Sequence, residues 1–182
     1  FNFDPYIVSA YLRHTMDDHL NYLEYMMGDK TSINGSLRNE HGRENPFVIK
    51  YYEIGNEEWE NPIEYAKDFK ILYDTIKSLY PDLNIIAAGN HWGGKEYITD
   101  QMNILNNSID VYGWHPAKTD LVNDDLPDTL NFLSIVGIPE YAADLEIKNH
   151  YNTCRKYNNR REFKVGITEW WSHYGDFTNW IL

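Results

Sequence analysis

The stretch Phe47-Val-Ile-Lys-Tyr-Tyr-Glu-Ile-Gly-Asn-Glu57 decides the fold. Residues 47–54 are β-branched and aromatic and almost continuously apolar, which is typical of a parallel strand buried on both faces. Gly55-Asn56 ends this run, and Glu57 follows at once. In α/β barrels the working side chains lie at the carboxyl ends of the strands, so Glu57 is a candidate functional residue.

A second short strand pattern, at 163–168, ends in the same way with Glu169, and Trp170 directly after it is a candidate contact for a sugar ring. Two carboxylates at strand ends, each beside aromatic residues, are what a retaining glycosidase needs. In such an enzyme one carboxyl group protonates the leaving oxygen and the other attacks the anomeric carbon, about 5–5.5 Å away. Each glutamate alone could be an ordinary helix-start carboxylate, so the pair carries this inference.

The rest of the chain alternates between helix and strand. Apolar residues at three- and four-residue steps predict a first helix over residues 12–27, which is followed by a loop rich in turn formers at 28–46. Asn61 and Pro62 predict the start of a second helix, which Pro81 ends. Its expected buried stripe is Ile63, Ala66, Phe69, Leu72, Ile76 and Leu79. Further helices are expected at 95–106 and 139–156, and strands at 84–88 and 109–113. This alternation predicts an α/β fold with right-handed crossovers and parallel pairing.

Two more strand ends carry candidate sugar contacts. His115 and Trp114 follow the strand at 109–113, and Trp92 follows the strand at 84–88. His115 could orient a carboxylate or bind a sugar hydroxyl, and a loop histidine with a structural hydrogen bond is the alternative. Trp92 lies in a Gly-rich turn whose shape needs no ligand, so its alternative is a purely structural role.

Composition restricts the possible partners. At 182 residues the chain is expected to form one domain, residues 1–182. Its net charge of −12 argues against nucleic acid or an anionic membrane as a partner, because both reward clustered Lys and Arg. No apolar run approaches the ~18–20 residues of a membrane span. The high aromatic content, 15% of residues, fits either core packing or platforms for sugar rings.

Cofactor and metal sites are not expected. Cys154 is the only cysteine, so neither an intrachain disulfide nor a zinc site built from cysteines is possible. No His-Glu-x-x-His motif occurs. Asn34-Gly-Ser and Asn106-Asn-Ser match the N-glycosylation pattern and favour an extracellular location, although the sequence leaves the compartment open.

These motifs together resemble the catalytic segments of family 51 glycoside hydrolases, the α-L-arabinofuranosidases of clan A. Tyr-Glu-Ile-Gly-Asn-Glu at 52–57 resembles the acid/base segment, and Ile-Thr-Glu-Trp at 167–170 resembles the nucleophile segment. Residues 21–28 resemble the third barrel helix, and Leu37-Arg38, Gly42 and Pro46 resemble the lead-in to the fourth strand. Residues 109–116 are similar to the sixth-strand segment.

The resemblance implies an incomplete TIM (β/α)8 barrel in which strands similar to the fourth to seventh are visible. It also implies that Glu57 is the acid/base, Asn56 a substrate-binding neighbour and Glu169 the nucleophile. The first, second and eighth strands are not recognisable, and the third is doubtful within residues 1–10. Because a half barrel leaves two sheet edges unpaired, further segments or chains are expected to complete it.

Three functions therefore stay open at this point. The first is retaining hydrolysis of α-L-arabinofuranosides or related pentose-containing glycans. The second is another clan A activity, such as that of a β-xylosidase, because the two carboxylates are shared across the clan. The third is a non-catalytic, barrel-derived component of an extracellular assembly that binds glycans or has a structural role. An open cleft that brings Glu57 near Glu169 would favour an enzyme.

Overall fold

The computed structural model describes residues 4–57, 61–89, 94–115, 147–158 and 162–169, with short pieces at 117–118, 125, 127, 129–130, 133 and 171–172. Its centre is a sheet of five strands, all parallel, in the order β1-β2-β3-β4-β6. Their bounds are Tyr6–Ser9, Tyr51–Ile54, Asn84–Ala87, Val111–Trp114 and Lys164–Ile167. A small second sheet pairs β5 (Ala117–Lys118) with β7 (Trp171–Ser172), also in parallel.

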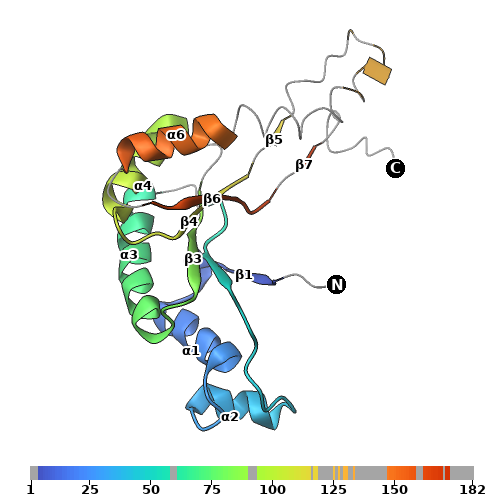
Figure 1. Cartoon of the computed structure of the whole chain (residues 1–182), viewed down its shortest axis with the longest axis vertical. Helices are drawn as coiled ribbons and strands as arrows, with labels where there is room; N and C mark the ends of the chain where they lie inside the picture. The colour runs from blue at the N-terminus through green and yellow to red at the C-terminus, as the bar shows by residue number, and fades with distance from the viewer. Residues whose placement is uncertain are drawn as a thin grey trace.

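Helices connect successive strands of the main sheet. They are α1 (Met16–Met27), α2 (Ile33–Glu40), α3 (Pro62–Leu79), α4 (Gly94–Leu105) and α6 (Ile147–Tyr157), and a 3-10 turn, Tyr11–Arg13, precedes α1. Helices α3, α4 and α6 lie along one side of the strands, and α1 and α2 gather at one end of the molecule (Figure 1). No described helix is both long and apolar enough to cross a bilayer.

The strands use their two faces differently. Tyr52, Ile54, Ile85, Ala87 and Tyr112 belong to the apolar core that α3 and α4 complete. Successive strand residues point to opposite faces, so the residues between them point away from these helices. That second face carries Glu53 and Gly113, and the functional cluster described below forms on it.

Residue 61 starts α3 as the sequence predicts. The Asn61 side chain accepts hydrogen bonds from the backbone amides of Ile63 and Glu64, and Pro62 occupies the first turn, where no amide is needed. The predicted buried stripe is confirmed for Ala66, Phe69, Leu72 and Ile76. It is wrong at its ends, because Ile63 in the first turn of α3 and Leu79 at its last residue are exposed.

Several predicted boundaries change. The first helix begins at Met16 instead of residue 12, because Thr15 and Asp18 form a reciprocal capping box. Strand β2 takes only the carboxyl-terminal half of the predicted 47–54, since the amide of Phe47 donates to the Met26 carbonyl at the end of α1. The doubtful strand within residues 1–10 is β1. Of the predicted helix at 139–156, residues 139–146 lie outside the described residues.

The predicted loop at 28–46 contains a helix, α2, and is therefore wrong in part. The Ser32 hydroxyl caps α2 by accepting from the Gly35 amide. Arg38 is fully buried and donates to four backbone carbonyls, those of Tyr25, Gly28, Arg43 and Glu44. Asn, Gly and Ser have modest helix propensity, so this tertiary anchoring overrides the local signal.

Candidate active site

Glu57 is placed by a sharp turn that directly follows β2. Gly55 has φ +92°, which glycine tolerates, and its amide donates to the Ser9 carbonyl of β1. Glu57 itself has φ +50°, an uncommon conformation for a residue with a side chain. Strained backbone of this kind costs about 1–3 kcal/mol and concentrates at functional sites. Asn56, between them, is exposed.

His115, directly after β4, brings the two predicted catalytic glutamates together. Its Nδ1 atom lies 3.0 Å from Oε1 of Glu57 and 3.8 Å from Oε2 of Glu169. Because one oxygen of each glutamate lies within 3.8 Å of the same nitrogen, the two carboxyl groups are close to each other. Their separation is compatible with the roughly 5–5.5 Å between the carboxyl groups of a retaining glycosidase. The His115 side chain is 3% exposed, whereas those of Glu57 and Glu169 are 22% and 50% exposed. The carboxylates are therefore open to a substrate and the imidazole is enclosed.

The other ring nitrogen of His115 is also fixed. Nε2 lies 3.1 Å from the hydroxyl of Thr168, the residue just before Glu169. The ring thus bridges the segments that follow β2, β4 and β6. Of the two alternatives for His115, the structure supports contact with the carboxylates and also shows a structural hydrogen bond.

A third carboxyl group, Glu53, lies behind this pair. It is 1% exposed, and its Oε1 atom has no hydrogen-bond partner among the described residues. Burial raises the pKa of Glu53 to about 7, the Thr168 hydroxyl partly offsets this as a hydrogen-bond donor, and the negative charge of Glu169 raises it further. The sequence showed a charge within a buried strand, and that signal could have singled out Glu53.

Gly113 and Tyr6 complete the surroundings of Glu53, and no motif in the sequence marks either of them. A Cβ atom at Gly113 would lie 2.7 Å from Oε1 of Glu53 and 3.0 Å from the Thr168 hydroxyl, so only glycine fits there. Tyr6 of β1 donates from its hydroxyl to the Thr168 carbonyl at 2.6 Å. Its pKa is raised by burial, then by the charges of Glu53 and Glu169.

Not every predicted contact residue joins this cluster. Trp114 is 5% exposed, and its ring stacks on His150 of α6 at a centroid distance of 4.7 Å. It therefore packs on the helical side of the sheet, because it alternates with Gly113 and His115. Trp92 and Trp170 lie outside the described residues, so their predicted substrate contacts stay predictions.

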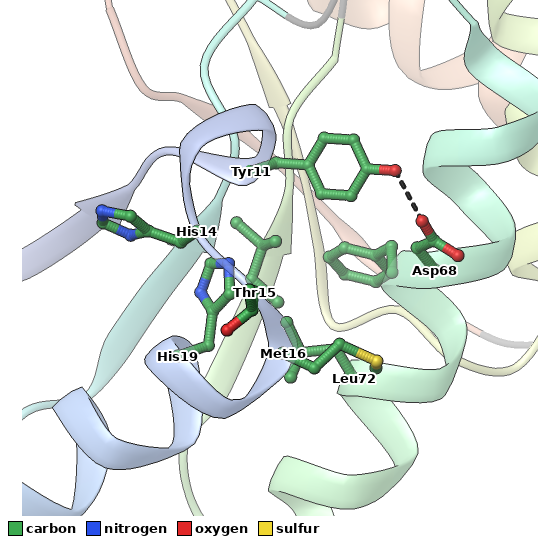
Figure 2. Close-up of a pocket in the computed structure, with 9 residues that line it drawn as sticks. Tyr11, His14, Thr15, Met16, His19, Asp68 and Leu72 are labelled. Atoms are coloured by element: carbon green, nitrogen blue, oxygen red, sulfur yellow. Dashed lines mark hydrogen bonds between the residues drawn. The ribbon is translucent and has the colours of Figure 1, made fainter.

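A pocket of about 320 Å³ lies elsewhere, between α3 and the segment that links β1 to α1 (Figure 2). Tyr11 donates to Asp68 across it at 2.7 Å. Its wall includes His19, whose Nδ1 atom pairs with the Tyr52 hydroxyl at 2.8 Å. Burial, followed by the nearby His14, lowers the pKa of His19 to about 4. None of the described residues that line this pocket belongs to the cluster around His115.

The described part of the chain holds no group of three or more His, Cys, Asp or Glu side chains suited to a metal ion. The chemistry available around His115 is that of carboxyl groups, an imidazole and hydroxyls.

Comparison with known proteins identifies the kind of domain. A family model described as "Alpha-L-arabinofuranosidase 1 domain" matches residues 4–159. A protein of Aspergillus flavus named "Probable alpha-L-arabinofuranosidase A" is 37% identical over 105 residues, which cover 57% of this chain and 15% of that protein. Alpha-L-arabinofuranosidase 1 of Arabidopsis thaliana is 39% identical over 72 residues, covering 40% of this chain and 10% of the relative.

Solved structures show the same fold. An alpha-L-arabinofuranosidase from Thermotoga maritima superposes with a TM-score of 0.78 at 23% identity, over 95% of this chain and 35% of that one. A family 51 alpha-L-arabinofuranosidase from Bifidobacterium longum gives 0.72 at 19% identity, over 88% of this chain and 34% of that one. The predicted incomplete α/β barrel is thereby confirmed, and the chain spans only a part of the relatives it matches.

Proposed function

Because this chain belongs to the alpha-L-arabinofuranosidase 1 domain family, we propose that it is part of the catalytic barrel of a retaining glycoside hydrolase. The proposed substrates are α-L-arabinofuranosides or related pentose-containing glycans. The names of the relatives support this class of sugar. Further segments of the polypeptide, or other chains, complete the barrel.

One observation carries the proposal: the oxygens of Glu57 and Glu169 approach the same nitrogen of His115, at 3.0 and 3.8 Å. Residues 57 and 169 are distant in sequence. They come close together because each directly follows a strand of one parallel sheet, and the carboxyl ends of parallel strands lie on the same side of the sheet. Nearby carboxyl groups beside an accessible surface are the arrangement that glycoside hydrolysis with retention requires.

In the proposed mechanism Glu57 protonates the oxygen of the leaving group while Glu169 attacks the anomeric carbon. This forms a covalent glycosyl-enzyme and breaks the glycosidic bond. Glu57, now ionised, then takes a proton from water, and the resulting hydroxide equivalent displaces Glu169 from the sugar. His115 holds the two carboxylates in register, and Asn56 hydrogen-bonds a sugar hydroxyl.

Aromatic platforms are proposed for Trp92 and Trp170, which follow β3 and β6 in sequence. Trp114 is left out of the proposed sugar contacts because its ring is buried against His150. The reaction as proposed needs two carboxyl groups and water and no cofactor.

Substitution of each glutamate in the complete protein tests these roles. With an unactivated arabinofuranoside, Glu57→Gln and Glu169→Gln should each lower kcat at least about 10³-fold, because proton donation or nucleophilic attack is lost. A dinitrophenyl glycoside has a leaving group that needs no proton. Glu57→Gln should therefore retain fast release of the first equivalent of dinitrophenol, whereas Glu169→Gln should lose it.

The matched control is Glu162→Gln, which neutralises an exposed carboxylate just before β6 and should leave turnover unchanged. Unchanged rates in both catalytic variants would end the proposal. Hydrolysis of xylosides in place of arabinofuranosides would support the wider clan A alternative. The half-exposed Glu169 argues against a purely structural descendant, in which the carboxylate pair would have no use.

A further inference from the structure

The hydroxyl of Tyr65, on α3, lies between the carboxyl ends of β2 and β3. It donates to the Ile54 carbonyl at 2.6 Å and accepts from the Ala88 amide at 2.7 Å. Ile54 and Ala87 form the last pair in the register of the two strands, so the hydroxyl sits just where direct pairing stops. Tyr65, Ile54 and Ala88 are each at most 1% exposed, so both hydrogen bonds are shielded from water.

This hydroxyl takes the place of a hydrogen bond in the sheet itself. At the start of the strand pair the Asn84 amide donates directly to the Lys50 carbonyl. The same relation recurs every second residue along a parallel ladder, and at the ends of the strands it falls on the Ala88 amide and the Ile54 carbonyl. A phenol can both donate and accept, so Tyr65 joins these two groups through a side chain.

The Ile54 carbonyl belongs to the peptide unit that begins the turn to Glu57. The amide of the same unit, that of Gly55, donates to the Ser9 carbonyl of β1 at 2.7 Å. The unit is therefore held from both sides, by Tyr65 and by Ser9. Because a peptide unit is planar, these two bonds fix its orientation, from which Gly55 takes its positive φ and the chain continues to Glu57.

We propose that Tyr65 is a positioning residue for Glu57. Its hydroxyl separates the ends of β2 and β3 and sets the peptide unit from which the turn directs Glu57 toward His115. The inference rests on the proposed function, since it assigns a further residue to the acid/base group of the same site. Tyr65 belongs to the core between α3 and the sheet, so it acts through the backbone and not on the sugar.

The ring of Tyr65 is itself held in place. Tyr11 packs edge-on against it at a centroid distance of 5.1 Å, and Phe69 packs against it at 5.9 Å. The Tyr11 hydroxyl is bound in turn to Asp68 of α3. The hydroxyl of Tyr65 therefore cannot shift without disturbing the core, and a group that positions another needs this kind of support.

Tyr73, further along α3, makes a comparable contact at the other end of the strands. Its hydroxyl donates to Oδ1 of Asp110 at 3.0 Å, and Asp110 directly precedes β4. The other oxygen of Asp110 accepts from the Ile85 amide, near the start of β3. Tyr65 and Tyr73 thus both bind the sheet through a buried phenol, but only Tyr65 does so at the end that carries Glu57.

The first test compares two substrates in the complete protein. Tyr65→Phe keeps the ring and removes the hydroxyl. With methyl α-L-arabinofuranoside, whose leaving group needs a proton, kcat/KM should fall about 10- to 100-fold, because Glu57 is displaced from the leaving oxygen. With the dinitrophenyl glycoside, whose leaving group needs none, kcat/KM should fall less than about threefold. A merely structural role would lower both values equally.

Tyr73→Phe is the matched control, since it removes the same hydroxyl from a similarly buried ring of the same helix. It should change kcat/KM less than about twofold with either substrate, because the reacting groups keep their places. Three results would overturn the proposal: an equal loss with both substrates in Tyr65→Phe, no loss with either, or a loss in Tyr73→Phe that also depends on the leaving group.

Amide hydrogen exchange supplies a measurement without turnover. In the wild type the Ala88 amide should be protected, because it donates to a buried hydroxyl. In Tyr65→Phe the amides of Ala88 and Gly55 should exchange at least about tenfold faster, and in Tyr73→Phe they should exchange as in the wild type.

An unprotected Ala88 amide in the wild type, or unchanged exchange of Gly55 in Tyr65→Phe, would refute the positioning role. A wild type that lacks glycosidase activity but shows the expected exchange in all three proteins would refute the proposed function, and it would leave the coupling of Tyr65 to the turn supported.

Discussion

At the residue scale the turn Gly55-Asn56-Glu57 connects the fold to the chemistry. Gly55 takes a positive φ that other residues avoid, and Glu57 takes one at a cost, so the carboxyl group is directed toward His115. The turn type was readable from the sequence because Gly-Asn after a buried strand is a strong stop signal. The convergence of residues 57 and 169 was also predictable from the sequence, because the carboxyl ends of parallel strands all lie on the same side of the sheet.

The sequence marks Glu53 as a charge within a buried strand, but it could not place Glu53 and Thr168 on the same side of the sheet at Gly113. That placement depends on Gly113 lacking a side chain and on the register that places Gly113 beside Gly166. Neither feature has a local signature, because strand register follows from packing of the whole sheet. Trp114 was misplaced for a related reason: alternation along β4 sends its ring toward α6, away from His115.

The raised pKa of Glu53 also predicts how stability depends on pH. The carboxyl titrates near 4.5 when unfolded and at about 7 when folded, so ionisation opposes folding once the pH rises through this window. Glu53→Gln should therefore become more stable relative to the wild type from about pH 4.5 to pH 7, by roughly 2–3 kcal/mol in the free energy of unfolding. Denaturant unfolding of both chains across this range measures the difference.

The comparison must be made between variants because His19 acts in the opposite direction. Because the pKa of His19 is lowered in the folded chain, the unfolded chain binds a proton at a higher pH than the folded chain does. The contribution of neutral His19 to the free energy of unfolding is therefore lost as the pH falls from 6.5 toward 4. Both proteins share this contribution, and it cancels in the difference. A difference that does not vary with pH would contradict the prediction for Glu53.

At the element scale α2 is held by one side chain. Arg38 joins the end of α1 to the segment after α2 through hydrogen bonds to four carbonyl groups, at 2.8–3.2 Å. A lysine ammonium has three donors and cannot reproduce the planar fork of arginine. Arg38→Lys should therefore lower the free energy of unfolding by about 2–4 kcal/mol, as measured by denaturant titration.

The control for this substitution is Arg13→Lys, which changes an exposed arginine in the 3-10 turn and should stay within about 0.5 kcal/mol of the wild type. Equal stabilities of both variants would show that the four carbonyls are satisfied without Arg38. The sequence predicted α1 and α3 well because both have apolar periodicity and strong caps. It could not predict α2, whose main stabilising contacts come from outside its own turn.

At the scale of the whole molecule, the described sheet ends in β1 on one side and β6 on the other. Tyr6, Val8 and Ile167 on these strands are exposed by 40–44%. Unpaired edges with apolar side chains promote association between chains. The isolated chain should therefore self-associate as its concentration rises, and Ile167→Lys should reduce this by placing a charge at the β6 edge. Sedimentation velocity measures both effects.

Ile71→Lys is the matched control, because it introduces the same charge on the exposed side of α3, away from the edges. It should leave the association unchanged. A single monomeric species at all concentrations, or an equal effect of the two substitutions, would show that the edges do not govern association. The α/β order of the chain was predictable from alternating periodicities, whereas the exposure of its edges depends on how much of the barrel the chain contains.

The hydroxyl of Tyr6 reaches the carbonyl of Thr168 from the opposite end of the five-stranded arc. This one hydrogen bond thus joins the first strand of the sheet to the segment that follows its last strand, next to Glu169. Any agent that loosens the amino-terminal strand, such as proteolysis before β2, would release that bond. The two glutamates would then drift apart although neither had been altered, so inactivation by clipping far from the reactive groups would have a mechanical origin.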